Sequence, residues 1–204
     1  VKARAAHEEV LDGAGLVLAT AGRLLADARR TRPDALLVPN ACEPAHFAPV
    51  QGRPVPAELA AIVASGRPIA GYYGALAAWF DYALLDAVAA RPPGWEFVLL
   101  GPDYDGTVAQ LPARPNVRWL GLKTYDELPA YLQAFTVATI PFVINDITRA
   151  TSPVKLFEYL AGDKPVVTTP MDEARRYASV RVADGAEAFA AALEAARAEA
   201  SSVG

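Results

Sequence analysis

The sequence predicts an α/β fold, in which a parallel sheet carries helices on both faces. Short apolar runs alternate with helix-patterned segments over most of the 204 residues, and this alternation is typical of repeated strand–helix–strand units. The predicted strands are apolar along their whole length, as strands buried on both faces are. With 53% hydrophobic and 21% charged residues, the chain has ample material for a core.

The first forty residues predict a small group of elements of their own. Hydrophobic spacing indicates a polar helix at 2–12, a strand at 15–20, a helix near 24–28 and a strand at 35–38. Prolines and glycines then crowd residues 39–56, which we interpret as a linker or domain boundary. We therefore divide the chain into residues 1–50, the end of an N-terminal domain with its linker, and residues 51–204, a second domain.

Beyond residue 56 the alternation becomes regular. Strands are expected at 68–74, 95–100, 116–120, 136–141, 165–169 and 180–182, and helices from Asp81, from Thr124, at 153–161, near 172–177 and from Glu187. Thr124 and Glu127 have capping-box spacing, and the residues that follow form an apolar stripe down to Phe135. In such sheets, ligands bind beyond the carboxyl ends of the strands.

Composition and charge exclude several classes of function. A net charge of −4 provides no global basic field for nucleic acid. Cys42 is the single cysteine, and His7 and His46 are the two histidines, so we expect no disulfide, no metal site and a reducing, cytoplasmic setting. The longest apolar stretch, near 135–144, is too short to span a membrane, and no signal peptide is visible. Because the chain opens without a methionine, we expect a fragment or a processed product.

Residues 148–169 carry the most informative pattern. Ser152 suits a helix N-cap and Pro153 the first helical position, while Gly162 marks the helix end. Lys155 falls in the first turn, where a cation opposes the helix dipole by roughly 0.3–1 kcal/mol. An ammonium and free N–H groups at one helix end are consistent with a docked phosphate.

Glu158 lies three residues after Lys155, on the same helix face and about one turn deeper. A carboxylate there could accept hydrogen bonds from both hydroxyls of a ribose. The alternative is a surface Lys–Glu pair, worth a few tenths of a kcal/mol. Since the acid-first order is the better one for such a pair, residue order counts slightly against this alternative, and the pattern alone leaves both interpretations open.

This segment resembles the donor-binding motif of GT-B glycosyltransferases, especially family 4 (group 1) enzymes, in Ser152-Pro-Val-Lys-Leu-Phe-Glu158 and Gly162-Asp-Lys-Pro-Val-Val167. Residues 38–43 with Phe47 resemble the segment that crosses between the two domains of such enzymes. Residues 116–121 and the following Tyr-Asp-Glu-Leu-Pro helix resemble the element whose backbone holds the base. The resemblance covers nearly the whole chain and implies the Rossmann-like C-terminal half of a GT-B fold.

The resemblance implies transfer of a hexosyl group from a nucleotide-sugar donor, usually a UDP-sugar, to a saccharide or lipid-linked acceptor, without a metal or other cofactor. Lys155 and Arg149 are the implied catalytic residues, which stabilise the leaving diphosphate. The implied donor-binding residues are Gly71, Gly74, Leu122, Lys123, Thr151, Ser152, Pro153, Val154, Lys155 and Glu158. The acceptor domain would lie mostly outside this chain, so we expect the chain alone to be inactive, with any peripheral association at the inner membrane face made through that domain.

The sequence departs from the family pattern near the expected sugar. A paired glutamate eight positions before Glu158 is replaced by Ala150, for which Asn145 or Asp146 is a candidate substitute. The usual Arg…Lys pair after the first strand is absent from residues 74–81. The donor sugar, the acceptor and the stereochemistry of transfer stay open.

Two other functions remain as alternatives. The first is a non-catalytic nucleotide-sugar-binding module. The second is a nicotinamide-dependent oxidoreductase, because Gly71-x-x-Gly74 follows a strand as half of a dinucleotide fingerprint, with Asp103 as a candidate ribose-binding acid. Asp103-Tyr104-Asp105 also matches a manganese-binding pattern, which we interpret as a solvated loop.

Overall fold

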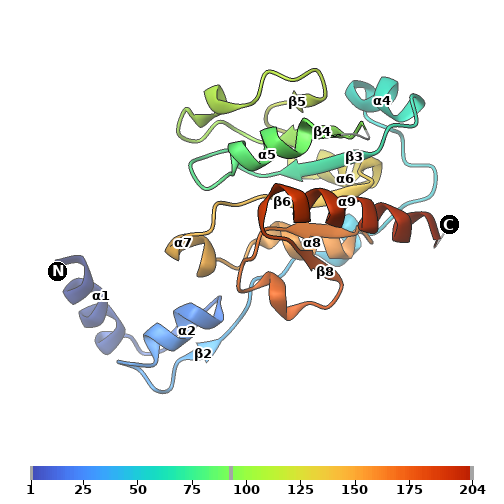
Figure 1. Ribbon diagram of the computed structural model, residues 1–204. Helices are drawn as coiled ribbons and strands as arrows, with labels where there is room; N and C mark the ends of the chain where they lie inside the picture. Colours follow the sequence, from blue (N-terminus) through green and yellow to red (C-terminus); the bar gives the residue numbers. More distant parts are fainter. Residues whose placement is uncertain (1, 92–93, 203–204) are drawn as a thin grey trace.

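The computed structural model describes residues 2–91 and 94–202 and contains two parallel sheets (Figure 1). The smaller sheet pairs β1 (Leu18–Ala19) with β2 (Leu36–Leu37). The larger has the order β5-β4-β3-β6-β7-β8. Its strands are β3 (Ile69–Tyr73), β4 (Glu96–Leu100), β5 (Val117–Trp119), β6 (Val137–Ile140), β7 (Val166–Thr168) and β8 (Val180–Val182). The predicted α/β class with a parallel sheet is confirmed.

Helices cover both faces of the larger sheet (Figure 1). The helices of this part are α3 (Pro44–Phe47), α4 (Ala60–Ala64), α5 (Tyr82–Ala89), α6 (Leu128–Ala134), α7 (Asp146–Arg149), α8 (Val154–Ala161) and α9 (Gly185–Ser202). Helices α5 and α9 pack together on one face, and α6 and α8 lie on the other with α3 between them. Among the described residues, no helix combines the length and apolar character that a bilayer crossing requires.

Local capping explains where some of these helices begin. The Asp81 side chain accepts a hydrogen bond of 2.8 Å from the Leu84 N–H and starts α5. The predicted capping box is present, because Thr124 N–H donates to Glu127 at 2.8 Å. A single 3₁₀ turn, Tyr125–Glu127, precedes α6.

Helix α8 begins one residue later than predicted. Pro153 occupies the N-cap position and no side chain caps the helix. The prediction that Ser152 is the N-cap is wrong, because its hydroxyl is buried without a hydrogen-bond partner. The helix still ends at Ala161, before Gly162, as expected.

The N-terminal elements form a small unit that lies beside the larger sheet (Figure 1). Helix α1 (Lys2–Gly13), helix α2 (Gly22–Ala28) and the two short strands surround a core of Val17, Ala28 and Ala35. The strands are two residues long, shorter than predicted. An exposed ion pair of 2.8 Å joins Arg23 to Asp146 on α7. The proposed division at residue 50 stays a prediction.

The segment after β2 is fastened to the helical layer that covers the larger sheet. The Val38 N–H still bonds to Ala19 of the small sheet at 2.9 Å. Two residues later, the Asn40 side chain donates to the Ser152 carbonyl at 2.6 Å. Further on, the amide of Gln133 bonds to both the N–H and the C=O of Val50, at 3.2 and 2.9 Å. Residues 40–50 are therefore held against α6 and the start of α8.

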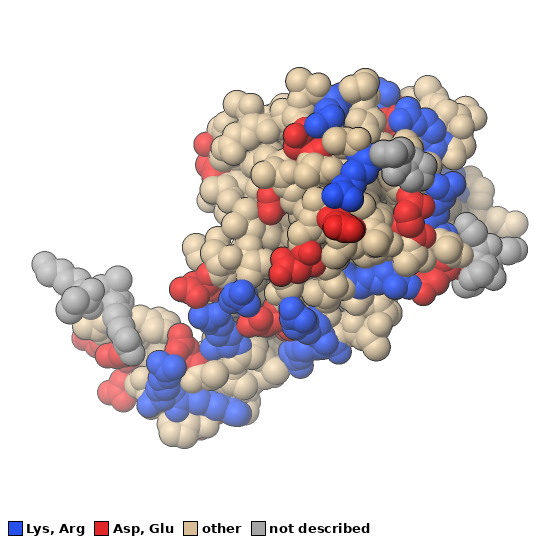
Figure 2. Space-filling view, viewed as in Figure 1, with Lys and Arg blue, Asp and Glu red and all other residues tan. Residues whose placement is uncertain are grey.

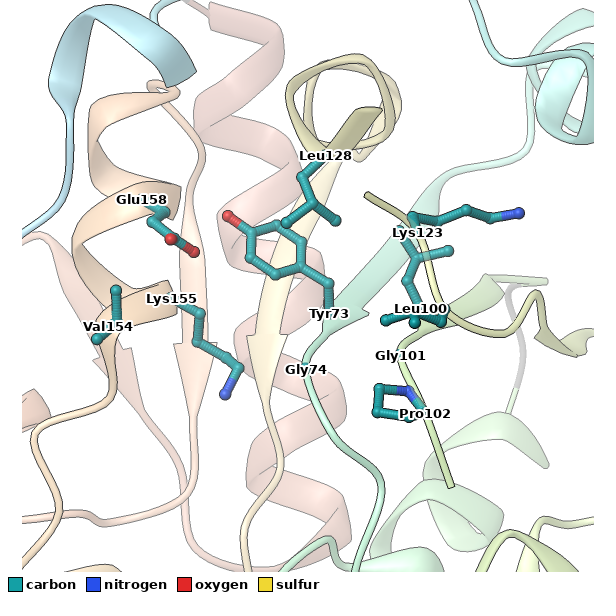
Figure 3. Close-up of a pocket in the computed structure, with 11 residues that line it drawn as sticks. Tyr73, Gly74, Leu100, Gly101, Pro102, Lys123, Leu128, Val154, Lys155 and Glu158 are labelled. Carbon is teal, nitrogen blue, oxygen red and sulfur yellow. The ribbon is translucent and has the colours of Figure 1, made fainter. Parts of the chain in front are cut away.

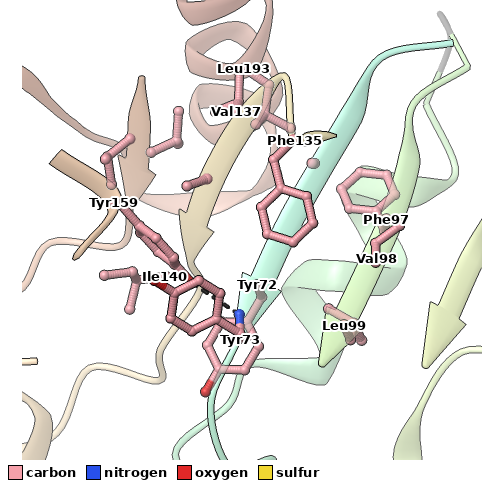
Figure 4. Packing of buried hydrophobic residues seen from close by; sticks show 14 of the residues in the cluster. Tyr72, Tyr73, Phe97, Val98, Leu99, Phe135, Val137, Ile140, Tyr159 and Leu193 are labelled. Atoms are coloured by element: carbon pink, nitrogen blue, oxygen red, sulfur yellow. Dashed lines mark hydrogen bonds between the residues drawn. The ribbon is translucent and has the colours of Figure 1, made fainter. Parts of the chain in front are cut away.

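From β3 the chain continues outward through β4 to β5. It then returns to β6, on the other side of β3, and continues outward through β7 to β8. Strands β3 and β6 therefore flank a topological switch point. Strand β3 pairs with β4 as far as Tyr73–Leu100 but with β6 only as far as Gly71–Ala138. The Tyr73 N–H beyond that point donates to the Tyr159 hydroxyl of α8 at 3.0 Å (Figure 4). A helix side chain thus replaces the missing strand partner, and the two strands separate.

Gly71 lies inside β3 and does not reach the carboxyl edge of the sheet. A Cβ atom added there would stand 2.1 Å from the Phe135 ring, which is itself buried. The prediction of Gly71 as a ligand-binding turn residue is therefore wrong in its geometry, because the missing side chain makes room for an aromatic ring of the core. The partial dinucleotide fingerprint Gly71-x-x-Gly74 therefore loses one of its two glycines.

Charged side chains of both signs are interspersed over the visible face of the molecule (Figure 2). A mixed surface of this kind matches the expectation from the net charge of −4. It offers no single-sign field on that face to attract a polyanion.

We predict that Gly71→Ala lowers the free energy of unfolding by about 1–3 kcal/mol, because the added methyl overpacks a closed part of the core. Urea unfolding measures the difference. Gly15→Ala is the matched control, since nothing lies within 4 Å of the added atom there. Equal effects of the two substitutions would contradict the packing role of Gly71.

Candidate functional site

A pocket of about 370 Å³ opens beyond the carboxyl ends of β3 and β4, beside the first turns of α8 (Figure 3). Its volume lies within the range of small-molecule sites. Its position next to the switch point is where open α/β sheets bind ligands. The lining residues are Tyr73, Gly74, Leu100, Gly101, Pro102, Leu122, Lys123, Leu128, Val154, Lys155 and Glu158.

Two glycines allow the walls of the pocket to approach each other. Gly101 and Gly74 have φ values of +132° and +133°, which side-chain-bearing residues rarely adopt. A Cβ atom on Gly101 would lie 2.0 Å from the Gly74 carbonyl oxygen, and one on Gly74 would lie 2.6 Å from Cε of Lys155. The backbone of Gly74 at the end of β3 is therefore packed against the end of the Lys155 side chain.

Lys155 is half-buried and brings a cation into the pocket. Its Nζ lies 5.3 Å from the centre of the Tyr72 ring and 5.1 Å from that of Phe142, and it has no hydrogen bond or ion pair to any described residue. Burial lowers the pKa of Lys155 to about 8, while the charge of Glu158 acts in the opposite direction. The ammonium faces a space that suits an anion.

The start of α8 adds backbone donors to this cation. The Leu156 N–H bonds to the Pro153 carbonyl at 3.0 Å, whereas the N–H groups of Val154 and Lys155 have no partner among the described residues. Free N–H groups at a helix start bind anions, and the helix dipole favours negative charge at the same end. The ammonium of Lys155 and the free N–H groups at the start of α8 therefore both favour an anion at the same end of the helix.

Glu158 lies one turn deeper on α8, and its residue is only 8% exposed. Its carboxylate and the Tyr73 hydroxyl point toward each other across the pocket wall (Figure 3). Burial raises the pKa of Glu158, and the Tyr73 hydroxyl and the charges of Lys155 and His46 oppose that shift. The pocket thus holds a hydrogen-bond acceptor next to its anion site.

Six of the ten predicted donor-binding residues line this pocket: Gly74, Leu122, Lys123, Val154, Lys155 and Glu158. Ser152 and Pro153 are buried and do not line it, and the Thr151 hydroxyl donates to the Ile147 carbonyl at 2.8 Å. Although Lys123 lines the pocket, its ammonium pairs with Glu58 at 2.9 Å.

Arg149 does not reach the pocket in this structure. Its guanidinium is exposed and lies 3.8 Å from Asp172. Neither candidate for the missing paired glutamate lines the pocket: Asn145 caps α7 and Asp146 pairs with Arg23. Among the described residues that line the pocket, Lys155 is therefore the one whose positive charge is unpaired.

The acidic loop after β4 has a structural role. Asp103 accepts hydrogen bonds from the N–H groups of Gly106 and Val108, and Asp105 accepts from Ala78 N–H and the Thr107 hydroxyl. Within the described parts of the chain, no three His, Cys, Asp or Glu residues gather as a metal site would require.

Sequence reasoning missed five residues of the lining: Tyr73, Leu100, Gly101, Pro102 and Leu128. Gly101-Pro102 ends β4 in the way that Gly74 ends β3, and this symmetry was a usable signal. No sequence signal indicated the role of Tyr73, because an aromatic residue at the end of an apolar strand looks the same in sequence as a residue of the hydrophobic core.

We predict that Glu158→Gln raises the free energy of unfolding of the ligand-free protein at pH 7. Because burial raises the pKa of Glu158 above its ordinary value of 4.5, its ionised form destabilises the fold, and this effect vanishes once the pH falls below about 4.5. Urea unfolding at both pH values measures it. Glu96→Gln is the control: that buried carboxylate pairs with Arg67 and Arg118, so its loss lowers stability by about 1–3 kcal/mol.

Comparison with known proteins identifies the family of this chain. Residues 59–198 match the family model of the glycosyl transferases group 1. A Bacillus subtilis (strain 168) protein named as a teichuronic acid biosynthesis glycosyltransferase, TuaH, is 33% identical over 104 residues, which are 50% of this chain and 26% of that protein.

Solved structures share the fold at lower identity. Anabaena HepE in complex with UDP and glucose matches with a TM-score of 0.68 and 16% identity, over 98% of this chain and 62% of that one. The trehalose 6-phosphate synthase of Burkholderia multivorans matches with a TM-score of 0.73 and 12% identity, over 98% and 57%. The chain thus spans about a quarter to three fifths of the length of these relatives. By its sequence match and its GT-B fold, the chain belongs to the glycosyl transferases of group 1.

Proposed function

We propose that this chain is the donor half of a glycosyltransferase, which binds a UDP-sugar for transfer of a hexosyl group to a saccharide or lipid-linked acceptor. One observation carries the proposal. An unpaired ammonium and two free N–H groups gather at the start of α8, with a buried carboxylate one turn further along the same pocket. A diphosphate followed by a ribose presents the complementary groups in the same order.

In this proposal the diphosphate lies at Lys155 and the N–H groups of Val154 and Lys155. The ribose hydroxyls donate to Glu158, about 4.5 Å further along the helix axis. Since the leaving group in the reaction is the nucleoside diphosphate, donors aimed at its oxygens stabilise the charge that develops there. No metal is needed in this scheme. Arg149 would contribute only after giving up its 3.8 Å contact with Asp172.

The base would lie against the loop after β5. Leu122 is 72% exposed on the pocket rim, and the peptide groups of Leu122 and Lys123 form no hydrogen bond with any described residue. An exposed apolar side chain and free peptide groups suit the face and the edge of a planar base. The complexes of Anabaena HepE with UDP and with UDP-glucose support uracil as that base.

A non-catalytic nucleotide-sugar-binding module is the second candidate. The observation that favours it is the absence of a carboxylate at Ala150, with Asn145 and Asp146 both engaged elsewhere. Joining the chain to an acceptor domain and assaying sugar transfer separates the two, since transfer by the joined protein supports the enzyme and binding without transfer supports the module. The oxidoreductase alternative loses its support with Gly71, which is buried under Phe135. A cytoplasmic location, at the inner membrane face through the acceptor domain, is part of the same proposal.

We predict that Lys155→Ala and Glu158→Ala each weaken UDP binding by about tenfold or more, because each removes a charge-assisted hydrogen bond worth about 1.5–3 kcal/mol. Calorimetric titration with UDP measures the loss, and circular dichroism is expected to show that both variants stay folded. Arg181→Ala is the control, since it removes a cation from β8, away from the pocket. Equal UDP affinity in all four proteins would refute the proposed site.

We further predict that UDP binding weakens about tenfold between pH 7 and pH 9. With a pKa of about 8, the protonated fraction of Lys155 falls by that factor over this range, and the diphosphate binds the protonated form. Lys155→Arg keeps its charge throughout, so its UDP affinity is expected to stay constant over this range. Any effect of the titration of uracil itself would appear equally in both proteins. Matching pH profiles in the two proteins would contradict the role of Lys155.

A further inference from the structure

The Tyr73 hydroxyl is an unsatisfied polar group in the pocket wall. In the described part of the chain, three buried side-chain polar atoms have no hydrogen-bond partner: Arg53 Nη1, Ser152 Oγ and Tyr73 Oη. Of these, only Tyr73 belongs to a residue that lines the pocket. An unsatisfied buried hydroxyl costs about 1–3 kcal/mol. Because phenylalanine would fill the same space without that cost, packing alone does not account for the hydroxyl.

The ring of Tyr73 is held in place on several sides. It meets the Tyr159 ring edge-on, with centroids 4.7 Å apart, and stacks on Phe47 at 6.4 Å. Its own N–H is bonded to the Tyr159 hydroxyl, and the residue is 3% exposed. The hydroxyl therefore keeps its position, and any group that pairs with it has to come to it.

Glu158 is the group placed to do so. Its carboxylate faces the Tyr73 hydroxyl in Figure 3, and it sits on a side chain with three rotatable bonds. Burial raises the pKa of Tyr73, and the charges of Tyr159 and Glu158 act in the same direction. The phenol therefore stays protonated at every working pH and acts as a hydrogen-bond donor to a carboxylate.

We propose that Tyr73 is a positioning residue: in the occupied pocket its hydroxyl donates to one oxygen of the Glu158 carboxylate and thereby turns the other oxygen toward the ribose diol. This inference rests on the proposed function and adds to it a residue that sets the preference for ribose. A hydrogen bond of this kind also stabilises the ionised form of Glu158. Loss of the hydroxyl then makes Glu158 easier to protonate.

The test uses Tyr73→Phe, which keeps the ring and removes one oxygen. In the protein saturated with UDP, an NMR titration of the Glu158 side-chain carboxyl carbon is expected to move its midpoint to higher pH. At pH 7.5, UDP affinity is expected to fall about tenfold, and the affinity for 2′-deoxy-UDP by less than threefold, because the deoxy sugar offers fewer hydroxyls to the carboxylate. Urea unfolding is expected to show equal or greater stability.

Tyr82→Phe is the matched control. Its hydroxyl bonds to Thr107 at 2.9 Å, outside the pocket, so neither the Glu158 titration nor nucleotide affinity is expected to change. An unmoved Glu158 midpoint in Tyr73→Phe, or equal losses for UDP and 2′-deoxy-UDP, overturns the positioning role and leaves the proposed function intact. If the wild-type protein binds neither nucleotide, the proposed function fails and the role of Tyr73 toward ribose fails with it.

Discussion

The hydrogen bond from the Tyr73 N–H to the Tyr159 hydroxyl allows the sheet to part where the pocket begins. Strands β3 and β6 stop pairing after Gly71 and Ala138, and the peptide group freed at that point would otherwise be buried without a partner. By bonding to a side chain of α8, it ties the helix that carries Lys155 and Glu158 to the end of the central strand. This link helps to set the position of both charged groups.

The charges in the pocket are unfavourable to the empty protein and, in the proposed function, favourable to its ligand. Lys155 sits half-buried at the positive end of a helix, and Glu158 is buried one turn below it. Neither forms an ion pair with another described residue, and the pKa of each is shifted toward its neutral form. In the proposed function, a polar site that is already assembled needs little rearrangement when a diphosphate and a ribose enter. The large core built from both faces of the six-stranded sheet offsets the instability of this arrangement.

Most of the fold was predictable because the alternation of strands and helices is local and regular. The pairing of Lys155 with Glu158 on one face was predictable for the same reason, since helical spacing determines it. The errors concern contacts between residues far apart in the chain. Gly71 and Gly74 look alike in sequence, and only the Phe135 ring over the first one separates core from pocket. The cation of Lys123 is taken up by Glu58, whose place in space no sequence pattern indicated. The short helices α3, α4 and α7 have four or five residues, too few for a periodic pattern to stand out.

The attachment of the connecting segment leaves a very short hinge. Val38 is bonded to the small sheet and Asn40 to Ser152, two residues before α8, so Pro39 alone lies between the two anchored parts. The proline ring fixes one of its two backbone torsions, which confines any swivel of the parts to a few neighbouring single bonds. The exposed Arg23–Asp146 ion pair is a second link between the same two parts. In the proposed function, such a joint restricts the directions from which an acceptor can meet the pocket.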